Sequence, residues 1–203
     1  MTRTKPAEQR RADLLAAGQA QFLANGIAAT SLADITDAAG VSKGLFYLYF
    51  KSKQELVLAL QDQFSTEFAE RILDAAAAEP DWGAKLDACV QAGVDFYGDM
   101  YELHEVLFHH AHDTSGHDSK LGYGGPVMAA IARILTQGVA AGAFDVADPW
   151  ATAVLCYASL HALGRGFQGG PAGVPDPAEP DGPRVLGAAK ALFRRAAGAV
   201  LPI

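Results

Sequence analysis

A short stretch near the N-terminus carries side chains suited to binding nucleic acid. If it forms a helix, five residues point away from the rest of the fold: Lys43, Gly44, Leu45, Tyr47 and Tyr49. A lysine can reach a phosphate or a guanine edge, while tyrosine hydroxyls bond phosphates and tyrosine rings touch thymine methyl groups. The glycine lets the backbone approach DNA closely. The pattern suits a DNA groove, although an ordinary helical hairpin with aromatic packing uses the same residue types.

Histidines are concentrated in one part of the chain, which raises the question of a metal site. Five of the six lie between residues 104 and 117, namely His104, His109, His110, His112 and His117. On one helix, Glu105, His109 and Asp113 share a face at a spacing of four, an arrangement that can hold Zn²⁺ or Ni²⁺. The spacing matches no established metal motif, and a polar helix end running into a loop explains the same residues. We predict no metal and no cofactor, and keep a metal-sensing protein and a helical-bundle metalloenzyme as alternatives.

Helix signals surround these residues, and no segment shows the alternation typical of a strand. The predicted helices cover about residues 6–25, 31–39, 42–50, 52–78, 82–112 (one helix or two), 126–142, 149–168 and 184–200. The stretch between the last two is too rich in proline and glycine for a helix. The predicted fold class is therefore all-α, with a three-helix head, a connecting helix and a helical body.

Two capping boxes and one glycine define the head. Ser31 with Asp34 opens the second helix, and Ser52 with Glu55 opens the fourth. Gly40 supplies the backbone freedom that a tight turn between the second and third helices needs. The predicted inward-facing residues are Leu14, Leu15, Gly18 and Phe22 in the first helix, and Ile35, Val41, Phe46 and Phe50 around the turn.

Composition and charge agree with a folded protein whose head is more basic than its body. Residues 1–55 hold seven Lys/Arg and five Asp/Glu, a net of +2, whereas residues 56–203 hold nine and eighteen, a net of −9. A basic head on an acidic body fits a DNA-reading domain. No apolar run is long enough for a membrane span, and the charged N-terminus does not resemble a signal peptide. We expect a soluble, cytoplasmic protein with no membrane partner, in which Cys89 and Cys156 are reduced and buried.

The run TSLADITDAAGVSKGLFYLYFKSKQEL over residues 30–56 resembles the DNA-binding signature of TetR-family transcriptional regulators nearly throughout. The matching features are the alanine–glycine–valine–serine turn, the phenylalanine–tyrosine pair, the aromatic pair that ends at Phe50, and the lysine before the fourth helix. Phe22 and Gly26 match the first helix of the family. Close similarity covers about residues 8–60, and beyond it the resemblance lies only in length, helicity and loop placement.

The resemblance implies a helix-turn-helix DNA-binding domain over residues 1–55 and an effector-binding and dimerisation domain over residues 56–203. It implies a non-enzymatic regulator, a repressor by expectation, that binds a palindromic double-stranded operator as a homodimer and is released by a small effector. The implied DNA contacts are Ser31, Ser42, Lys43, Gly44, Leu45, Tyr47, Tyr49 and Lys53. Tyr49 stands where many members carry histidine, so it brings no possible charge. Leu45 occupies a variable position, so the operator sequence does not follow from the resemblance.

The second part of the chain is expected to bind the effector and the partner subunit. In the family, two C-terminal helices pair with those of the partner, and a stripe in this sequence has coiled-coil-like spacing: Leu186, Ala189, Phe193, Ala197 and Val200. Packing of that stripe within the subunit is the alternative. The predicted effector-binding residues are Phe68, Phe96, Met100, Phe108, His109, Met128, Tyr157 and His161. They suit a hydrophobic or aromatic compound, and plain core packing is the alternative for each.

Overall fold

The computed structural model describes residues 6–109, 124–166 and 182–198, and every regular element within them is helical. The chain forms two compact units, one of residues 1–64 and 102–118 and the other of residues 65–101 and 119–203. Helix α4 (Lys53–Ala78) contributes to both. The all-α prediction is therefore confirmed, while the functional boundary between residues 55 and 56 stays a prediction. No helix in the described part of the chain has the length and apolar character needed to cross a membrane.

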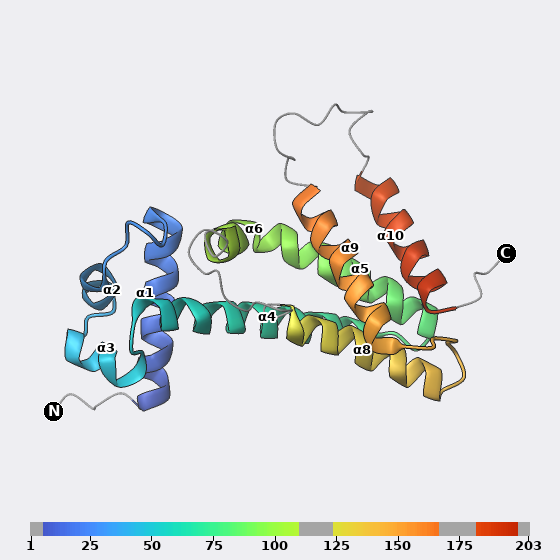
Figure 1. The fold of residues 1–203 in the computed structure, drawn as a ribbon, viewed down its shortest axis with the longest axis horizontal. Helices are drawn as coiled ribbons and strands as arrows, with labels where there is room; N and C mark the ends of the chain where they lie inside the picture. Colours follow the sequence, from blue (N-terminus) through green and yellow to red (C-terminus); the bar gives the residue numbers. More distant parts are fainter. Residues whose placement is uncertain (1–5, 110–123, 167–181, 199–203) are drawn as a thin grey trace. The chain divides into compact units, whose positions relative to one another are not determined.

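The first unit is built from α1 (Ala7–Asn25), α2 (Leu32–Ala38), α3 (Lys43–Tyr49) and the start of α4 (Figure 1). Its core contains all the predicted inward-facing residues except Val41, which is half-buried: the buried ones are Leu14, Leu15, Gly18, Phe22, Ile35, Phe46 and Phe50. Gly18 allows close packing, because a Cβ at that position would lie 2.5 Å from the end of the Leu56 side chain, which would have to shift. Burial of these large apolar groups holds the head together.

The predicted long helix over 82–112 is interrupted in the structure. Helix α5 (Trp82–Asp99) ends at Met100, whose backbone leaves the helical region at φ −112° and ψ 16°. A short α6 (Tyr101–His104) and a π-helical turn, η1 (Glu105–His109), follow. Gly98 lies two residues before this break, and the sequence left open whether residues 82–112 form one helix or two.

The second unit packs the rest of α4 and α5 with α8 (Gly125–Ala140), α9 (Pro149–Gly166) and α10 (Gly182–Ala196). Its core includes Phe68, Ile72, Phe96, Ile131, Leu160 and Phe193. Most bounds of the predicted helices agree with the structure to within about two residues, but α10 ends four residues before the predicted 200. Helix α8 approaches the following loop so closely that a Cβ at Gly138 would lie 2.0 Å from the Phe144 ring.

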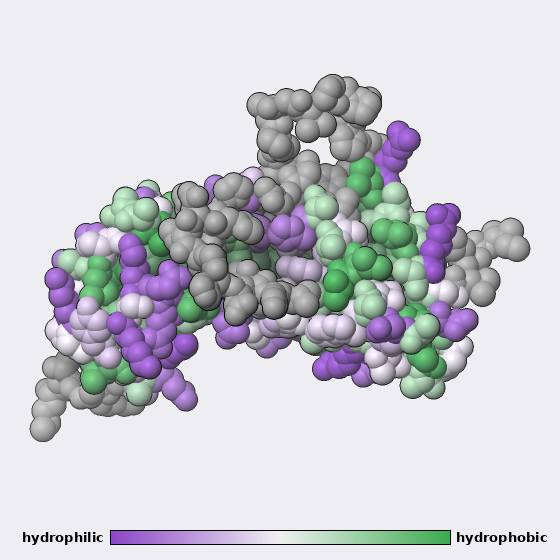
Figure 2. Space-filling view, viewed as in Figure 1, coloured by the Kyte–Doolittle hydropathy of each residue, from purple (hydrophilic) through white to green (hydrophobic). Residues whose placement is uncertain are grey.

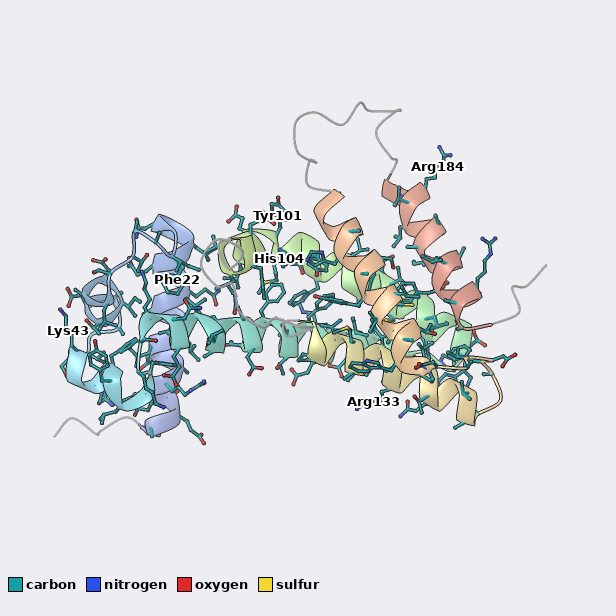
Figure 3. All side chains as sticks on the ribbon, viewed as in Figure 1. Phe22, Lys43, Tyr101, His104, Arg133 and Arg184 are labelled. Atoms are coloured by element: carbon teal, nitrogen blue, oxygen red, sulfur yellow. The ribbon has the colours of Figure 1, made fainter. Side chains whose placement is uncertain are left out.

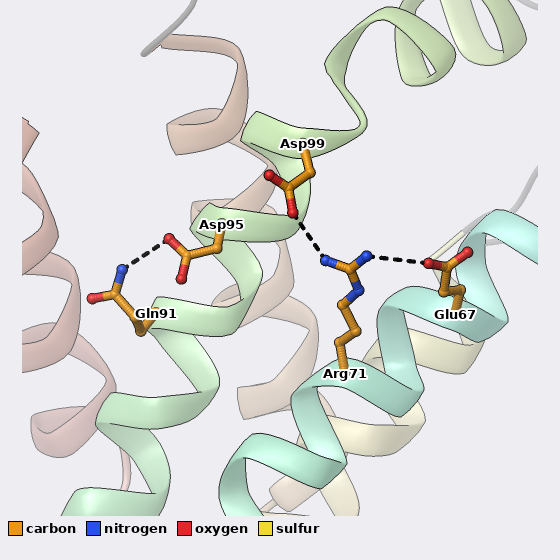
Figure 4. A network of polar contacts seen from close by, with 5 residues as sticks. All are labelled: Glu67, Arg71, Gln91, Asp95 and Asp99. Carbon is orange, nitrogen blue, oxygen red and sulfur yellow. Dashed lines mark hydrogen bonds and ion pairs between the residues drawn. The ribbon is translucent and has the colours of Figure 1, made fainter.

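Side-chain contacts at the surface join α4 to α5 in this unit. Arg71 bonds Asp99 at 3.0 Å and Glu67 at 3.3 Å, and Gln91 bonds Asp95 at 3.0 Å along α5 (Figure 4). The Arg71 guanidinium also lies 5.1 Å above the Phe96 ring. Because the ion pairs are exposed, each contributes at most about 1 kcal/mol, and the apolar core carries most of the stability.

The stripe on α10 packs inside its own subunit. Ala189, Phe193 and Ala197 are buried, and α10 lies against α5. The prediction that these residues face a partner subunit is therefore wrong for these three, and the intramolecular alternative is correct. Spacing shows that a helix has an apolar face but does not show what covers it.

Candidate nucleic-acid interface and effector site

Local hydrogen bonds that the sequence predicts fix the start of α2 and the start of α3. Ser31 Oγ accepts from the Asp34 backbone N–H at 3.2 Å, and Asp34 Oδ2 accepts from the Ser31 N–H at 2.7 Å, which forms the capping box. The hydrogen bonds from Ser31 lower the pKa of the Asp34 carboxyl. Gly40 adopts φ 63°, and Ser42 Oγ accepts from the Leu45 N–H at 3.2 Å to begin α3. These contacts set the direction in which α3 leaves the turn.

Helix α3 is anchored by two phenylalanines and exposes its other face. Phe46 and Phe50 are buried, with ring centroids 5.6 Å apart. Lys43 is exposed and projects from α3, in contrast to Phe22, which points into the head (Figure 3). The exposed positions of Lys43, Gly44 and Tyr47 are confirmed, whereas Leu45 and Tyr49 are half-buried.

Leu48 is an exposed residue that the sequence analysis missed. Its side chain is 77% exposed, beside Tyr47 at 57%. Gly44, Tyr47 and Leu48 are spaced by three and four residues, so they share one face of α3. An apolar side chain on that face is suited to touch a thymine methyl group. The helical spacing from Gly44 was the signal that could have identified it.

Lys53 has a structural role that the sequence did not suggest. Its Nζ donates to the carbonyl oxygens of Ile27 and Thr30, each at 2.6 Å. These acceptors lie in the loop between α1 and α2, so the ammonium clamps that loop to the start of α4. Two of the three N–H groups are used, and one is left for another acceptor.

The second capping box is only partly formed. The Glu55 N–H donates to Ser52 Oγ at 3.1 Å, as predicted. The Glu55 carboxylate, however, accepts from the N–H of Lys51 at 2.6 Å rather than from that of Ser52. The long side chain reaches one residue further back, which the motif alone could not decide.

In the second unit, four predicted effector residues form one aromatic cluster through Tyr97. Phe68 stacks on Phe96 with centroids 4.6 Å apart and planes at 8°, and it meets Tyr97 edge-on at 5.1 Å. The ring centroid of His161 lies 5.8 Å from that of Tyr97 and 6.1 Å from that of Tyr157. Tyr97 was not among the predicted residues. Its position in α5, one after Phe96, gave no sign that it would lie between Phe68 and His161.

The two tyrosine hydroxyls of this cluster are buried. The hydroxyls of Tyr97 and Tyr157 bond each other, and burial raises the pKa of both phenols. Tyr157 also meets the start of α8 tightly, because a Cβ at Gly124 would lie 2.4 Å from its ring. Apolar rings with a few polar groups are the usual lining of a small-molecule site.

The remaining predicted effector residues lie in several parts of the fold. Met128 is buried in α8, and Met100 is half-buried where α5 ends. Phe108 lies in the first unit, 5.4 Å from Phe64. The side chain of His109 lies outside the described residues.

The histidine-rich segment is described only at its beginning. His104 is buried, stacks on Phe108 with centroids 5.0 Å apart, and has Nδ1 at 3.5 Å from the Glu105 carboxylate. His110, His112 and His117 lie outside the described residues. Within the described ranges there is no group of three candidate metal ligands.

Both cysteines are free and buried, as expected. Burial raises the pKa of the Cys156 thiol to about 11, and burial also raises that of Cys89. Neither thiol is therefore ionised near neutral pH.

Comparison with known proteins connects this geometry to one family. The family model for bacterial regulatory proteins of the tetR family matches residues 14–60. The HTH-type transcriptional activator FasR of Mycolicibacterium smegmatis is 28% identical over 141 residues, which cover 70% of this chain and 60% of FasR. The HTH-type transcriptional regulator TtgR of Pseudomonas putida is 46% identical over 61 residues, 30% of this chain and 29% of TtgR. The matched part of the chain thus spans less than two thirds of either relative.

The similarity of fold extends further than that of sequence. A crystal structure of a TetR-family transcriptional regulator from Pectobacterium atrosepticum superposes with a TM-score of 0.68 at 25% identity, covering 97% of both chains. The match to the family model includes α2, α3 and the turn between them, which present Lys43 and Tyr47. The chain belongs to the TetR family of bacterial transcriptional regulators.

Proposed function

We propose that this protein is a repressor that binds a near-palindromic operator as a homodimer and is released from DNA by a small hydrophobic or aromatic effector. The observation that carries the proposal is the outward face of α3, where Lys43 and Tyr47 are exposed on a helix anchored by buried Phe46 and Phe50. The family consists of transcription factors, which argues against the metalloenzyme alternative. Binding to operator DNA requires a cytoplasmic location.

The predicted DNA contacts fit the hydrogen bonds of the head. Ser31 and Ser42 use their oxygen atoms as acceptors within the fold, so each hydroxyl proton is left to donate to a phosphate. Lys43 supplies a charge for a phosphate or a guanine edge, and Lys53 has one N–H beyond those given to the loop. Gly44, Leu45, Tyr47 and Tyr49 complete the proposed contact set, and Leu48 joins it from the structure.

The proposed dimer uses faces of α9 and α10 that the subunit leaves uncovered. Leu155 on α9 is 73% exposed and Leu192 on α10 is 50% exposed, although both are large and apolar. Apolar residues gather on the visible surface over these two helices (Figure 2). Pairing with the same face of a partner would bury them. To read two successive major grooves, the two copies of α3 in the dimer must lie about 34 Å apart, one turn of DNA.

The proposed effector site centres on Phe68, Phe96, Tyr157 and His161, with Tyr97 between them. Met100, Phe108, His109 and Met128 remain in the proposed set of effector-binding residues. A ligand that binds better to a dimer with a different spacing of the two heads shifts the population toward it and weakens operator binding.

The test is selection of bound DNA from a random pool by the purified chain, followed by a screen for compounds that release the selected duplex. We expect an enriched site with two-fold symmetry and release by aromatic compounds. The Lys43→Ala/Tyr47→Ala double variant is the matched control, since it removes exposed groups only. Equal enrichment by this variant, or no enriched sequence, would refute operator recognition by α3.

Two further measurements test the proposed dimer interface and whether the protein represses or activates transcription. Leu155→Glu places a charge on the proposed interface and should give a monomer in light scattering, whereas Val139→Glu on α8 should not. FasR is an activator, so a reporter gene driven from the selected operator distinguishes repression from activation.

A further inference from the structure

The carboxamide of Gln61 on α4 has a buried oxygen that the fold does not explain. The residue is only 1% exposed, and its Nε2 donates to the Leu107 carbonyl oxygen at 2.6 Å. No donor among the described residues reaches its Oε1, which is also buried. A buried acceptor without a donor is destabilising, and such groups in native proteins call for an explanation.

The surroundings of this amide are flat and aromatic. Leu107 belongs to the π-helical turn η1, and the next residue, Phe108, stacks on His104 with centroids 5.0 Å apart and planes at 29°. Phe64 lies three residues after Gln61 on α4. Its ring centroid is 5.4 Å from that of Phe108 and 5.8 Å from that of His104. All these residues belong to the first compact unit. Single π-helical turns are frequent at functional sites.

We propose that the first unit holds a second effector site, separate from the Phe68 cluster, in which Gln61 Oε1 accepts a hydrogen bond from the ligand. This ligand is therefore an aromatic compound carrying an OH or NH group. The rings of Phe64, His104 and Phe108 offer faces and edges to a flat ligand, and the amide oxygen selects its donor. This inference rests on the proposed function, because it describes the ligand that releases the operator.

The same amide connects the ligand to the head. Its nitrogen holds η1 to α4, while its oxygen is available to the ligand, so both ends of one side chain act together. Helix α4 begins at Lys53, whose ammonium clamps the loop between α1 and α2. A ligand that engages Gln61 thus binds the helix that supports the DNA-contacting elements.

The experiment compares two pairs of probes that differ in the donor: 2-naphthol with 2-methoxynaphthalene, and indole with 1-methylindole. Dissociation constants are measured by calorimetry on the full chain. We expect the donor of each pair to bind wild type about tenfold more tightly, the usual effect of one neutral hydrogen bond. Gln61→Met should reduce that ratio to about one. Gln61→Glu retains an acceptor oxygen and should preserve the preference, and circular dichroism checks that both variants are folded.

Equal binding of both members of each pair to wild type would overturn the inference, since Oε1 would then accept from an internal water only. A donor preference that persists in Gln61→Met, or no binding by any probe, would overturn it as well. Failure of the proposed function looks different. If the donor probes bind through Gln61 but do not release the selected duplex, the ligand site at Gln61 is supported and the effector function is refuted. If a compound that releases the duplex binds wild type and Gln61→Met equally, release by an effector is supported and the site at Gln61 is refuted.

Discussion

Replacement of Lys53 by methionine tests the clamp that joins the loop after α1 to α4. Methionine keeps an unbranched apolar stem but removes both hydrogen bonds, to the carbonyl oxygens of Ile27 and Thr30. Hydrogen bonds to a charged group contribute about 1.5–3 kcal/mol each, and the half-buried position of Lys53 favours the lower end. For two hydrogen bonds we therefore expect the loop to lose about 3 kcal/mol of local stability.

The assay must report on the head, and tryptophan fluorescence does not, because Trp82 and Trp150 both lie in the second unit. Amide hydrogen exchange of the segment between α1 and α2 is the suitable measurement. A loss of about 3 kcal/mol corresponds to exchange that is faster by about 150-fold.

The matched control is Lys51→Met, which removes an exposed ammonium two residues away and should leave exchange unchanged. Equal exchange in Lys53→Met and wild type would refute the clamp. The salt dependence of DNA binding tests whether Lys53 also contacts a phosphate through its remaining N–H. Loss of such a contact would lower the slope of log binding constant against log salt concentration by about one.

Four further predictions concern the two units. Lys43→Ala should weaken binding to all sequences and lower the salt slope by about one, and an unchanged slope in a salt titration would contradict a phosphate contact. Tyr47→Ala should cost about 1–3 kcal/mol on the selected operator, and an equal loss on random DNA would show that Tyr47 reads no base. Gly138→Ala forces a Cβ into the Phe144 ring and should destabilise the body by about 1–3 kcal/mol, measured as a lower urea midpoint by tryptophan emission; an unchanged midpoint would show that the loop moves freely. The pKa of Asp34 is lowered in the folded state, so its capping contribution is present above the ordinary value of 3.8 and is lost as the pH falls through the lower folded value. Asp34→Asn should flatten the loss of helical signal in that acid range, and the same acid profile as wild type would argue against the capping role.

The head could be read from the sequence because its signals are local. Ser31 and Asp34 are three residues apart, so the hydrogen bonds between them require no distant partner. Gly40 needs only its own positive φ to make the turn. Once the turn and the buried Phe46 are fixed, helical periodicity places Lys43 and Tyr47 outside, as the sequence analysis expected.

The effector region was only partly predictable. Phe68, Phe96, Tyr157 and His161 were chosen for their chemistry, and the fold brings them together from α4, α5 and α9. Tyr97, which lies between them, could not be chosen, because which side of α5 meets α9 depends on how the helices pack. For the same reason the sequence did not show that the oxygen of Gln61 is buried.

The sequence by itself determined the helices of the head, the turn and the exposed face of α3, since propensity, capping and periodicity act over three or four residues. Tertiary structure decided what covers each apolar face and where each long side chain ends. It buried Phe193 of α10 within the subunit, left Leu155 of α9 exposed and sent the Lys53 ammonium to the loop after α1. These outcomes depend on contacts between residues far apart in the chain, and such contacts are set by packing rather than by local pattern.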